Sequence, residues 1–300
     1  MQLNKKEQQA RQKICLPLDG LATLNEARAR VEELSPVVGL FKVGKESYTR
    51  FGPAIIKMVQ GYDSNVFLDL KYHDIPNTVS GAANAATHNS VWMFNVHASG
   101  GREMLKSAVK AAQKANEIYG IPKPKTIGVT VLTSIGPAEY LDINKPLVPL
   151  LSYDNLKSYF GMKTDDIELQ KEFAEMLTRE GYSHLVIDDE KGLRSNVIEQ
   201  EVLNLARMSN ESGLDGVVCS AADLYAIKEH LPSDFIYVTP GIKGPNTPAG
   251  VDQKRVFTPG KAIEDGSTYL VIGRAITGQK TSDKRLQAGY EILQDMAKHL

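Results

Sequence analysis

Few features of this 300-residue chain mark a specialised class of protein. It has two cysteines and one tryptophan, and its 35 basic and 36 acidic residues leave a net charge of −1. Two cysteines are too few for the disulfide framework of a small secreted protein. The balanced charge indicates no general affinity for polyanions, so we expect no nucleic-acid partner.

Long hydrophobic runs are also absent. No apolar stretch approaches the roughly 18 residues of a membrane span, and residues 1–13 are polar, without the apolar segment of a signal peptide. Cys15 and Cys219 lie in apolar runs and lack the spacing of metal ligands. We interpret them as buried small hydrophobic residues in a reducing compartment. We therefore expect a soluble, cytoplasmic protein with no membrane contact.

What the chain does contain is a regular alternation of short apolar runs with segments of helical periodicity. Each run is too apolar for a half-exposed strand and fits a parallel sheet that helices cover. Eight such strands predict an α/β fold, a (β/α)8 TIM barrel, with a doubly wound open sheet as the alternative. The predicted strands are 14–18, 38–43, 66–70, 92–96, 126–132, 216–220, 235–239 and 269–273. The predicted helices include 23–34, 53–60, 100–118, 197–209 and 222–229.

One region interrupts the alternation. About eighty residues separate Thr133 from the predicted sixth strand, many more than a single crossover helix needs. We predict one barrel domain over residues 1–300, with a polar N-terminal arm at 1–13 and an insertion at about 135–195 on the active-site face. For the insertion we favour a structural or dimer-contact role over a separate activity.

The most informative stretch is residues 67–78, FLDLKYHDIPNT, which holds Asp69, Lys71 and Asp74. Side chains two apart on a strand share a face, so we expect Asp69 and Lys71 to point the same way. A lysine beside a carboxylate in a site that excludes water stays protonated, which suits a general acid and not a Schiff-base nucleophile. The alternative is a surface ion pair at a strand end. The apolar strand and the Ile-Pro-Asn-Thr loop predicted after it favour the functional interpretation.

A second group of features indicates a phosphorylated substrate. Residues 241–253, GIKGPNTPAGVDQ, predict a long loop of the kind that acts as a lid or binding loop. The eighth strand ends in Gly273 and Arg274. A glycine there lets a backbone N–H approach an anion, and arginine offers a forked partner for phosphate. Phosphate sites in such barrels commonly follow the last two strands. The alternative is a helix cap beside a flexible loop.

Two histidines lie near predicted strand ends. For His97 we expect a structural hydrogen-bonding role, because it has no second ligand at metal spacing. His73 would share the face of Lys71 only if the strand ran on past that lysine, and Pro76 indicates that it does not. The direction of the His73 side chain stays open.

Eight motifs resemble, in order, the bacterial type of orotidine 5′-phosphate decarboxylase more than the eukaryotic type. Matching segments run from residue 14 to about residue 277. They are FKVGKE, FLDLKYHDIPNTV, NVHASGG, VLTS, GLDGVVCSA, TPGI, DQKRV-TP and LVIGR-IT.

The resemblance implies cofactor-independent decarboxylation of orotidine 5′-phosphate to UMP in pyrimidine biosynthesis, with no metal. It implies that Lys71 donates a proton to carbon 6 of the pyrimidine and that Asp69 lies against the substrate carboxylate. Asp74 and Thr78 would reach the partner's active site in a homodimer. The other implied substrate contacts are Asp19 and Lys42 at the ribose, Thr133 at the pyrimidine, and Gln253, Gly273 and Arg274 at the phosphate. The family often has an arginine after TPGI; here Lys243 keeps the charge without the fork.

Two other functions are compatible with parts of this pattern. Magnesium-dependent phosphosugar decarboxylases and aldolases resemble the chain in barrel and in D-x-K-x-x-D, and a chelator would distinguish them. A catalytically silent nucleotide-binding barrel is the other alternative. The HDIPNT and DQKRV-TP segments favour the nucleotide enzyme over the first, and the intact Asp69, Lys71 and Asp74 weigh against the second.

Overall fold

The structure is a computed structural model that describes residues 2–136, 139–140, 143, 192–244 and 257–300. These fall into two compact units, Met1–Thr130 with Leu205–Leu300, and Val131–Asn204. Each unit is described by itself.

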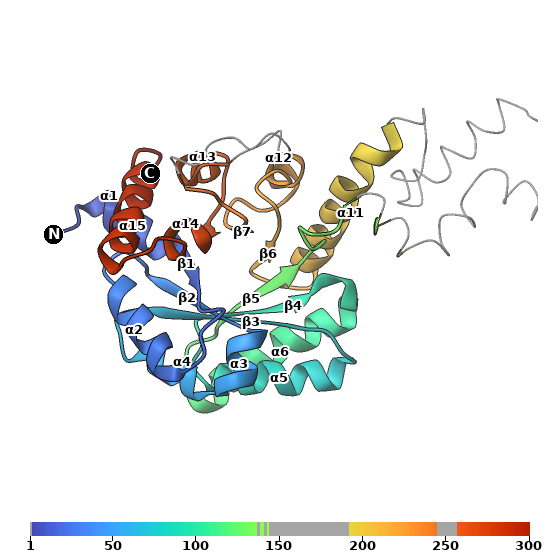
Figure 1. Ribbon diagram of the computed structural model, residues 1–300. Helices are drawn as coiled ribbons and strands as arrows, with labels where there is room; N and C mark the ends of the chain where they lie inside the picture. Colours follow the sequence, from blue (N-terminus) through green and yellow to red (C-terminus); the bar gives the residue numbers. More distant parts are fainter. Residues whose placement is uncertain (1, 137–138, 141–142, 144–191, 245–256) are drawn as a thin grey trace, which may run out of the picture. The chain divides into compact units, whose positions relative to one another are not determined.

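The first unit contains a closed barrel in which the strands follow one another in chain order, all parallel (Figure 1). The predicted (β/α)8 barrel is therefore confirmed, and each of the eight predicted strands is present. The strands are β1 (Ile14–Pro17), β2 (Leu40–Gly44), β3 (Asn65–Tyr72), β4 (Met93–His97), β5 (Lys125–Val129), β6 (Gly216–Val218), β7 (Ile236–Pro240) and β8 (Tyr269–Val271).

Helices lie around the outside of the strands, as Figure 1 shows for the first unit. Its helices are α1 (Lys5–Lys13), α2 (Leu24–Leu34), α3 (Lys45–Phe51), α4 (Ala54–Gln60), α5 (Pro76–His88), α6 (Arg102–Tyr119), α12 (Leu224–Ile227), α13 (Pro259–Glu264), α14 (Arg274–Thr277) and α15 (Ser282–Ala297), and α11 (Gly192–Glu211) belongs to both units. Short 3-10 turns occupy Ala98–Gly100 and Lys228–His230.

Two segments next to predicted strands are helical; the sequence left the order of the first open and predicted a loop for the second. The polar N-terminal arm contains α1, whose first turn is closed by a capping box between Asn4 and Glu7 and which packs on α15. The loop predicted through Pro76 is instead the start of α5. Proline fits the first helical position because its missing N–H would have no partner there.

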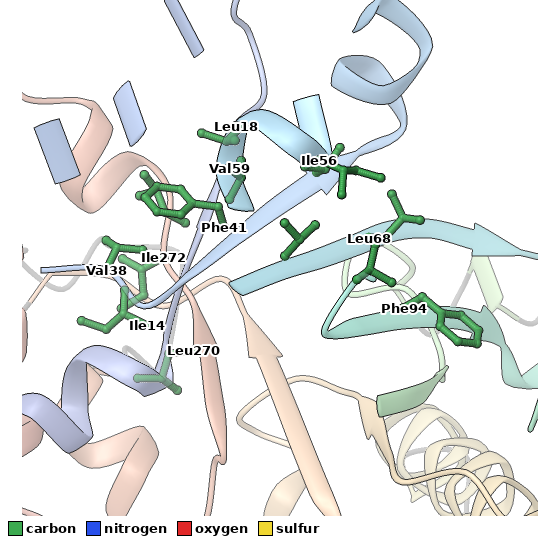
Figure 2. Close-up of a cluster of buried hydrophobic side chains, with 14 of the residues drawn as sticks. Ile14, Leu18, Val38, Phe41, Ile56, Val59, Leu68, Phe94, Leu270 and Ile272 are labelled. Carbon is green, nitrogen blue, oxygen red and sulfur yellow. The ribbon is translucent and has the colours of Figure 1, made fainter. Parts of the chain in front are cut away.

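The core has two layers because side chains alternate across each strand. The outward-facing residues pack under the helices in one large cluster, which includes Ile14, Phe41, Leu68 and Phe94 (Figure 2). The inward-facing residues fill the barrel itself and form a second cluster. Its buried members are Cys15, Leu40, Phe67, Met93, Ile127, Ile236 and Val238. The two cysteines are free and buried, as predicted.

The second unit adds little that can be described. Most of the predicted insertion at about 135–195 lies outside the described residues, including its expected helix at 167–179 and strand at 183–188. None of the helices in the described ranges combines the length and the apolar character that a membrane crossing requires.

Candidate active site

The candidate site lies one step beyond the apolar filling of the barrel. On three neighbouring strands, an apolar inward residue is followed two positions later by a polar one: Leu40 by Lys42, Phe67 by Asp69, and Met93 by Asn95. Alternation turns all three polar side chains inward, toward the C-terminal end of the barrel. Active sites of such barrels form at that end.

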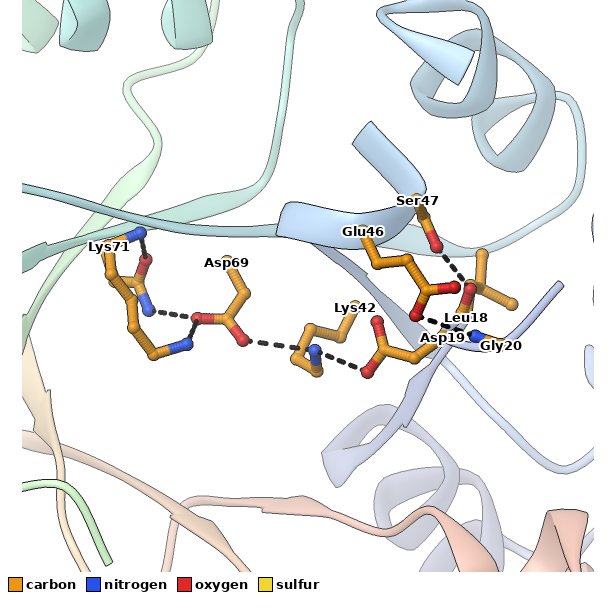
Figure 3. A network of polar contacts seen from close by, with 9 residues as sticks. Leu18, Asp19, Gly20, Lys42, Glu46, Ser47, Asp69 and Lys71 are labelled. Carbon is orange, nitrogen blue, oxygen red and sulfur yellow. Dashed lines mark hydrogen bonds and ion pairs between the residues drawn. The ribbon is translucent and has the colours of Figure 1, made fainter. Parts of the chain in front are cut away.

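A continuous chain of charges runs from β3 through Lys42 of β2 to Asp19, which follows β1 (Figure 3). The Lys71 Nζ lies 2.5 Å from Asp69 Oδ1, and the Lys42 Nζ lies 3.1 Å from Asp69 Oδ2. The same Lys42 ammonium lies 3.1 Å from Asp19 Oδ2. Asp69 is only 8% exposed, so its carboxylate is held between two cations in a largely dry position.

The pKa values follow from this arrangement. Burial by itself would raise the pKa of Asp69, but the charges of Lys42 and Lys71 and the hydrogen bonds from Lys71 and Asn95 outweigh it and hold the pKa below its usual range. Burial would lower the pKa of Lys42, and its two carboxylate neighbours raise it instead. Asp69 and Lys42 are therefore both charged near neutral pH.

The expected proximity of Asp69 and Lys71 is present, but simple strand alternation does not produce it. Between Leu68 and Tyr72 the register against β4 shifts, so that four residue steps of β3 match the two from Phe94 to Val96. Lys71 lies inside this irregularity with φ of 51°, a left-handed conformation that is rare for a residue other than glycine. β3 also continues one residue past Lys71, which the sequence did not indicate.

The segment that carries Asp19 is fastened to the start of α3. The Ser47 hydroxyl donates a hydrogen bond to the Leu18 carbonyl at 2.5 Å, and the Gly20 N–H donates to Glu46 Oε2 at 3.2 Å (Figure 3). Gly44 allows the neighbouring ion pair to form. A Cβ at this position would lie 2.8 Å from Asp19 Oδ1 and 2.9 Å from Lys42 Nζ.

The two histidines meet beside the site. The ring of His73 lies 5.1 Å from the ring of His97, between centroids, with the planes tilted by 43°. Burial, followed by the nearby His73, Lys45 and Lys71, lowers the pKa of His97 to about 4, so its ring is neutral near pH 7. The His73 side chain therefore points toward His97. The hydrogen-bonding role of His97 stays a prediction.

Asp74 and Thr78 lie away from this network, on the surface. The Asp74 carboxylate accepts a hydrogen bond from the next N–H, that of Ile75, at 2.7 Å. Ile75 is 67% exposed, and Thr78 in the first turn of α5 is also exposed. These residues form an uncovered stretch of chain between β3 and α5.

The predicted phosphate contacts are only partly within the described residues. Gly273 immediately precedes α14 at the end of β8, and Arg274 is exposed. Lys243 follows β7 and is partly buried, whereas Gln253 lies outside the described residues. Thr133 is exposed in a turn of the second unit. Within the part of the chain that the structure describes, no group of three or more His, Cys, Asp or Glu side chains could hold a metal ion.

Comparison with known proteins agrees with the motifs. The model of the Orotidine 5′-phosphate decarboxylase / HUMPS family matches residues 12–162 and 175–288. An orotidine 5′-phosphate decarboxylase of Syntrophus aciditrophicus (strain SB) is 38% identical over 289 residues, 96% of this chain and 94% of the relative. The chain belongs to this family.

Two further relatives support membership of the orotidine 5′-phosphate decarboxylase / HUMPS family. The orotidine 5′-phosphate decarboxylase of Vibrio atlanticus (strain LGP32) is 39% identical over 266 residues, 89% of this chain and 91% of the relative. The crystal structure of orotidine 5′-phosphate decarboxylase from Lactobacillus acidophilus superposes with a TM-score of 0.64 at 29% identity, covering 94% of this chain and 98% of that one. The resemblance inferred from the motifs is confirmed.

Sequence reasoning missed the residues that support this family member's charged network. Asn95 lies within the NVHASGG motif, but nothing in the sequence shows that its side chain meets Asp69 and the Lys71 backbone. Glu46 is the last residue of the FKVGKE motif and Ser47 follows it, but nothing in the sequence shows that they contact the segment that carries Asp19. The signal available was their position, two or three residues after an inward-facing strand residue.

Replacement of Gly44 tests the close approach of Asp19 and Lys42. Gly44→Ala should displace this ion pair and raise the KM for the substrate by about 10-fold, a change of about 1.4 kcal/mol. Both displaced atoms are the ends of flexible side chains, so we expect little change in stability. Steady-state kinetics and thermal unfolding measure the two effects.

The matched control is Gly81→Ala on α5, where an added Cβ meets no atom within 4 Å outside its own helix. Equal KM values for the Gly44 variant, the Gly81 variant and the wild type would contradict the proposed crowding.

Proposed function

We propose that this chain decarboxylates orotidine 5′-phosphate to UMP, with Lys71 as the proton donor. The observation that carries the proposal is the buried Asp69 carboxylate held between Lys42 and Lys71 at the C-terminal end of the barrel. The names of the relatives, which match over nearly their whole length, support this substrate over the phosphosugars of related barrels.

The reaction demands stabilisation of negative charge. The bond between carbon 6 and the carboxylate breaks, carbon dioxide leaves, and the electron pair remains on carbon 6 until it takes a proton from Lys71 Nζ. An ammonium group that is already in place stabilises this charge without reorganisation during the reaction. The contact of Lys71 Nζ with Asp69 Oδ1 at 2.5 Å supports such a role, because it fixes the ammonium before substrate binds.

Asp69 has two roles in this proposal. It orients Lys71, and it lies against the substrate carboxylate. Since the Lys42 and Lys71 charges hold the pKa of Asp69 below its usual range, Asp69 stays ionised across neutral pH. Lys42, with Asp19, would hold the ribose hydroxyl groups, which agrees with their joined position at the edge of the network.

The phosphate is the part of the substrate that lies away from the reacting carbon. Gly273 and Arg274, with Lys243, Gln253 and the loop at 241–253, would bind it, and Thr133 would contact the pyrimidine. Binding energy from a group that does not react can offset the cost of desolvating the reacting end. The exposure of Arg274 beside the end of β8 supports this assignment.

We infer a homodimer with shared active sites. Asp74 and Thr78 lie on the exposed stretch between β3 and the first turn of α5, next to a 67% exposed isoleucine. A two-fold partner covering this stretch would bury the isoleucine and receive Asp74 in its own site. A cytoplasmic location, supported by two free and buried thiols, belongs to the same proposal.

Lys71 provides the first test. Lys71→Ala should abolish turnover, measured as loss of the absorbance of orotidine 5′-phosphate, and a cooperative thermal unfolding transition should show that the variant is still folded. The reason is that no other proton donor contacts Asp69 from β3. The control is Lys57→Ala, which removes the same charge from an exposed position on α4. Decarboxylation near the wild-type rate by folded Lys71→Ala would refute the assignment.

Arg274 provides a test of phosphate binding. Arg274→Ala should lower kcat/KM for the nucleotide by roughly 100-fold, about 2.7 kcal/mol, and should change the slow reaction of the phosphate-free nucleoside far less. Arg274→Lys keeps the positive charge but loses the forked guanidinium, so its kcat/KM for the nucleotide should lie between those of the wild type and Arg274→Ala. Equal losses on nucleotide and nucleoside would place Arg274 away from the phosphate.

Mixed dimers test the shared site. Lys71→Ala and Asp74→Ala subunits should each be inactive alone. In a hybrid dimer one site would carry both lesions and the other neither. With random exchange about half of the dimers are hybrids, so activity should recover to roughly a quarter of wild-type sites. Brief denaturation and refolding ensures exchange. Verified hybrids without recovered activity would show that Asp74 serves its own subunit.

A further inference from the structure

The Asn95 side chain is fully buried on β4 and has both ends of its amide engaged by the proposed catalytic pair. The Lys71 backbone N–H donates to Asn95 Oδ1 at 2.8 Å, and Asn95 Nδ2 donates to Asp69 Oδ1 at 2.7 Å. Asn95 is 0% exposed. A single neutral side chain therefore contacts the backbone of one catalytic residue and the carboxylate of the other.

The irregularity of β3 explains why the Lys71 backbone needs this partner. With φ of 51° and the shifted register between β3 and β4, the Lys71 N–H turns to a side chain and not to a main-chain carbonyl of β4. A buried N–H without an acceptor is strongly unfavourable. The Asn95 carbonyl thus takes the place of the missing ladder bond and stabilises the left-handed conformation.

The Asp69 carboxylate is fixed in the same way. Its Oδ1 accepts from both Lys71 Nζ and Asn95 Nδ2, and its Oδ2 faces Lys42. Lys71 is held at both ends, at its N–H by Asn95 and at its ammonium by Asp69. The three residues close a ring of hydrogen bonds, and movement of the amide would release both members of the pair.

Charge balance and hydrogen bonding together favour an amide at position 95. Asp19 and Asp69 balance Lys42 and Lys71, so the network has equal numbers of anions and cations. An added carboxylate would lie in hydrogen-bonding contact with Asp69 and would repel it. An isosteric leucine would leave the part-buried Lys71 N–H without its acceptor.

We propose that Asn95 is a positioning residue that sets both the Lys71 backbone and the Asp69 carboxylate in their catalytic geometry. It acts through the roles proposed above for Lys71 and Asp69, so it rests on the proposed function. It is distinct from the charged residues because it neither gains nor loses a proton and does not itself react.

Asn95→Asp gives a test with a distinctive pH dependence. The introduced carboxylate can accept from the Lys71 N–H but cannot donate to Asp69 until it is protonated. The facing charged groups are Asp69 and Lys71 on β3 and Lys42 on β2. His97 lies two residues on along β4. The β5 residue in register, Ile127, is apolar. Both lysines contact Asp69, so they keep it ionised and direct an added proton to the introduced group.

We expect the kcat/KM of Asn95→Asp, as a fraction of the wild-type value at the same pH, to rise as the pH falls. Near pH 8 its kcat/KM should be roughly 100-fold below wild type, the loss that a small misplacement of catalytic groups can cause. Toward about pH 5.5 the protonated side chain restores a donor and an acceptor, and the deficit should shrink by roughly 10-fold or more. A deficit that does not shrink as the pH falls, or no deficit at all, would overturn the inference.

Two further variants distinguish a loss of positioning from a general loss of folding. Asn95→Leu should lose activity similarly, without recovery at low pH, and wild-type kcat/KM in a folded Asn95→Leu variant would also overturn the inference. The control is Thr126→Val on the neighbouring β5, whose buried hydroxyl has no hydrogen-bond partner in the described residues. It should leave kcat/KM unchanged at every pH.

The outcomes separate this inference from the proposed function. Full activity of Lys71→Ala, or no turnover of orotidine 5′-phosphate by the wild type, would contradict the proposed function. Inactive Lys71→Ala together with fully active Asn95 variants would contradict only the positioning role of Asn95.

Discussion

The ion pairs of the Asp69 carboxylate with Lys42 and Lys71 are the interaction on which the rest of this site depends. A carboxylate that is 8% exposed is unfavourable unless opposite charges and hydrogen bonds replace the water that it loses. Here two ammonium groups and an amide supply that compensation. Removal of any of these partners would leave a buried charge incompletely compensated, so the network is held together as a unit.

The barrel supplies the positions that make this compensation possible. Inward-facing residues alternate along each parallel strand, so Lys42, Asp69 and Asn95 each follow the apolar inward residue of their strand. By register Lys42 pairs with Phe67 and Gly44 pairs with Asp69, so the Lys42 side chain lies next to the strand that carries Asp69. The rest of the support comes from outside the ladder. The start of α3 fastens the segment that carries Asp19, and the absence of a Cβ at Gly44 leaves room for the Asp19–Lys42 pair.

Local strain and chemistry are linked at Lys71. Its left-handed backbone is unfavourable for a lysine and persists because Asn95 accepts its N–H. The same irregular turn brings Asp74 and Ile75 to the surface before α5 begins. One deviation from regular strand geometry thus places an ammonium group inside the barrel and an acidic residue on the surface.

The sequence by itself determined the barrel, because eight apolar runs alternating with helical segments have few other compact arrangements, and it determined the family through the block around Asp69 and Lys71. It could not determine the contacts of Asn95, the bulge in β3 or the helical start at Pro76. Local patterns report which face of a strand a residue lies on. The meeting of Lys71 with Asn95, 24 residues away in the chain, depends on strand register and on backbone conformation. Only the tertiary structure decided these, because it alone sets the acceptors that remain for a backbone N–H once regular pairing is lost.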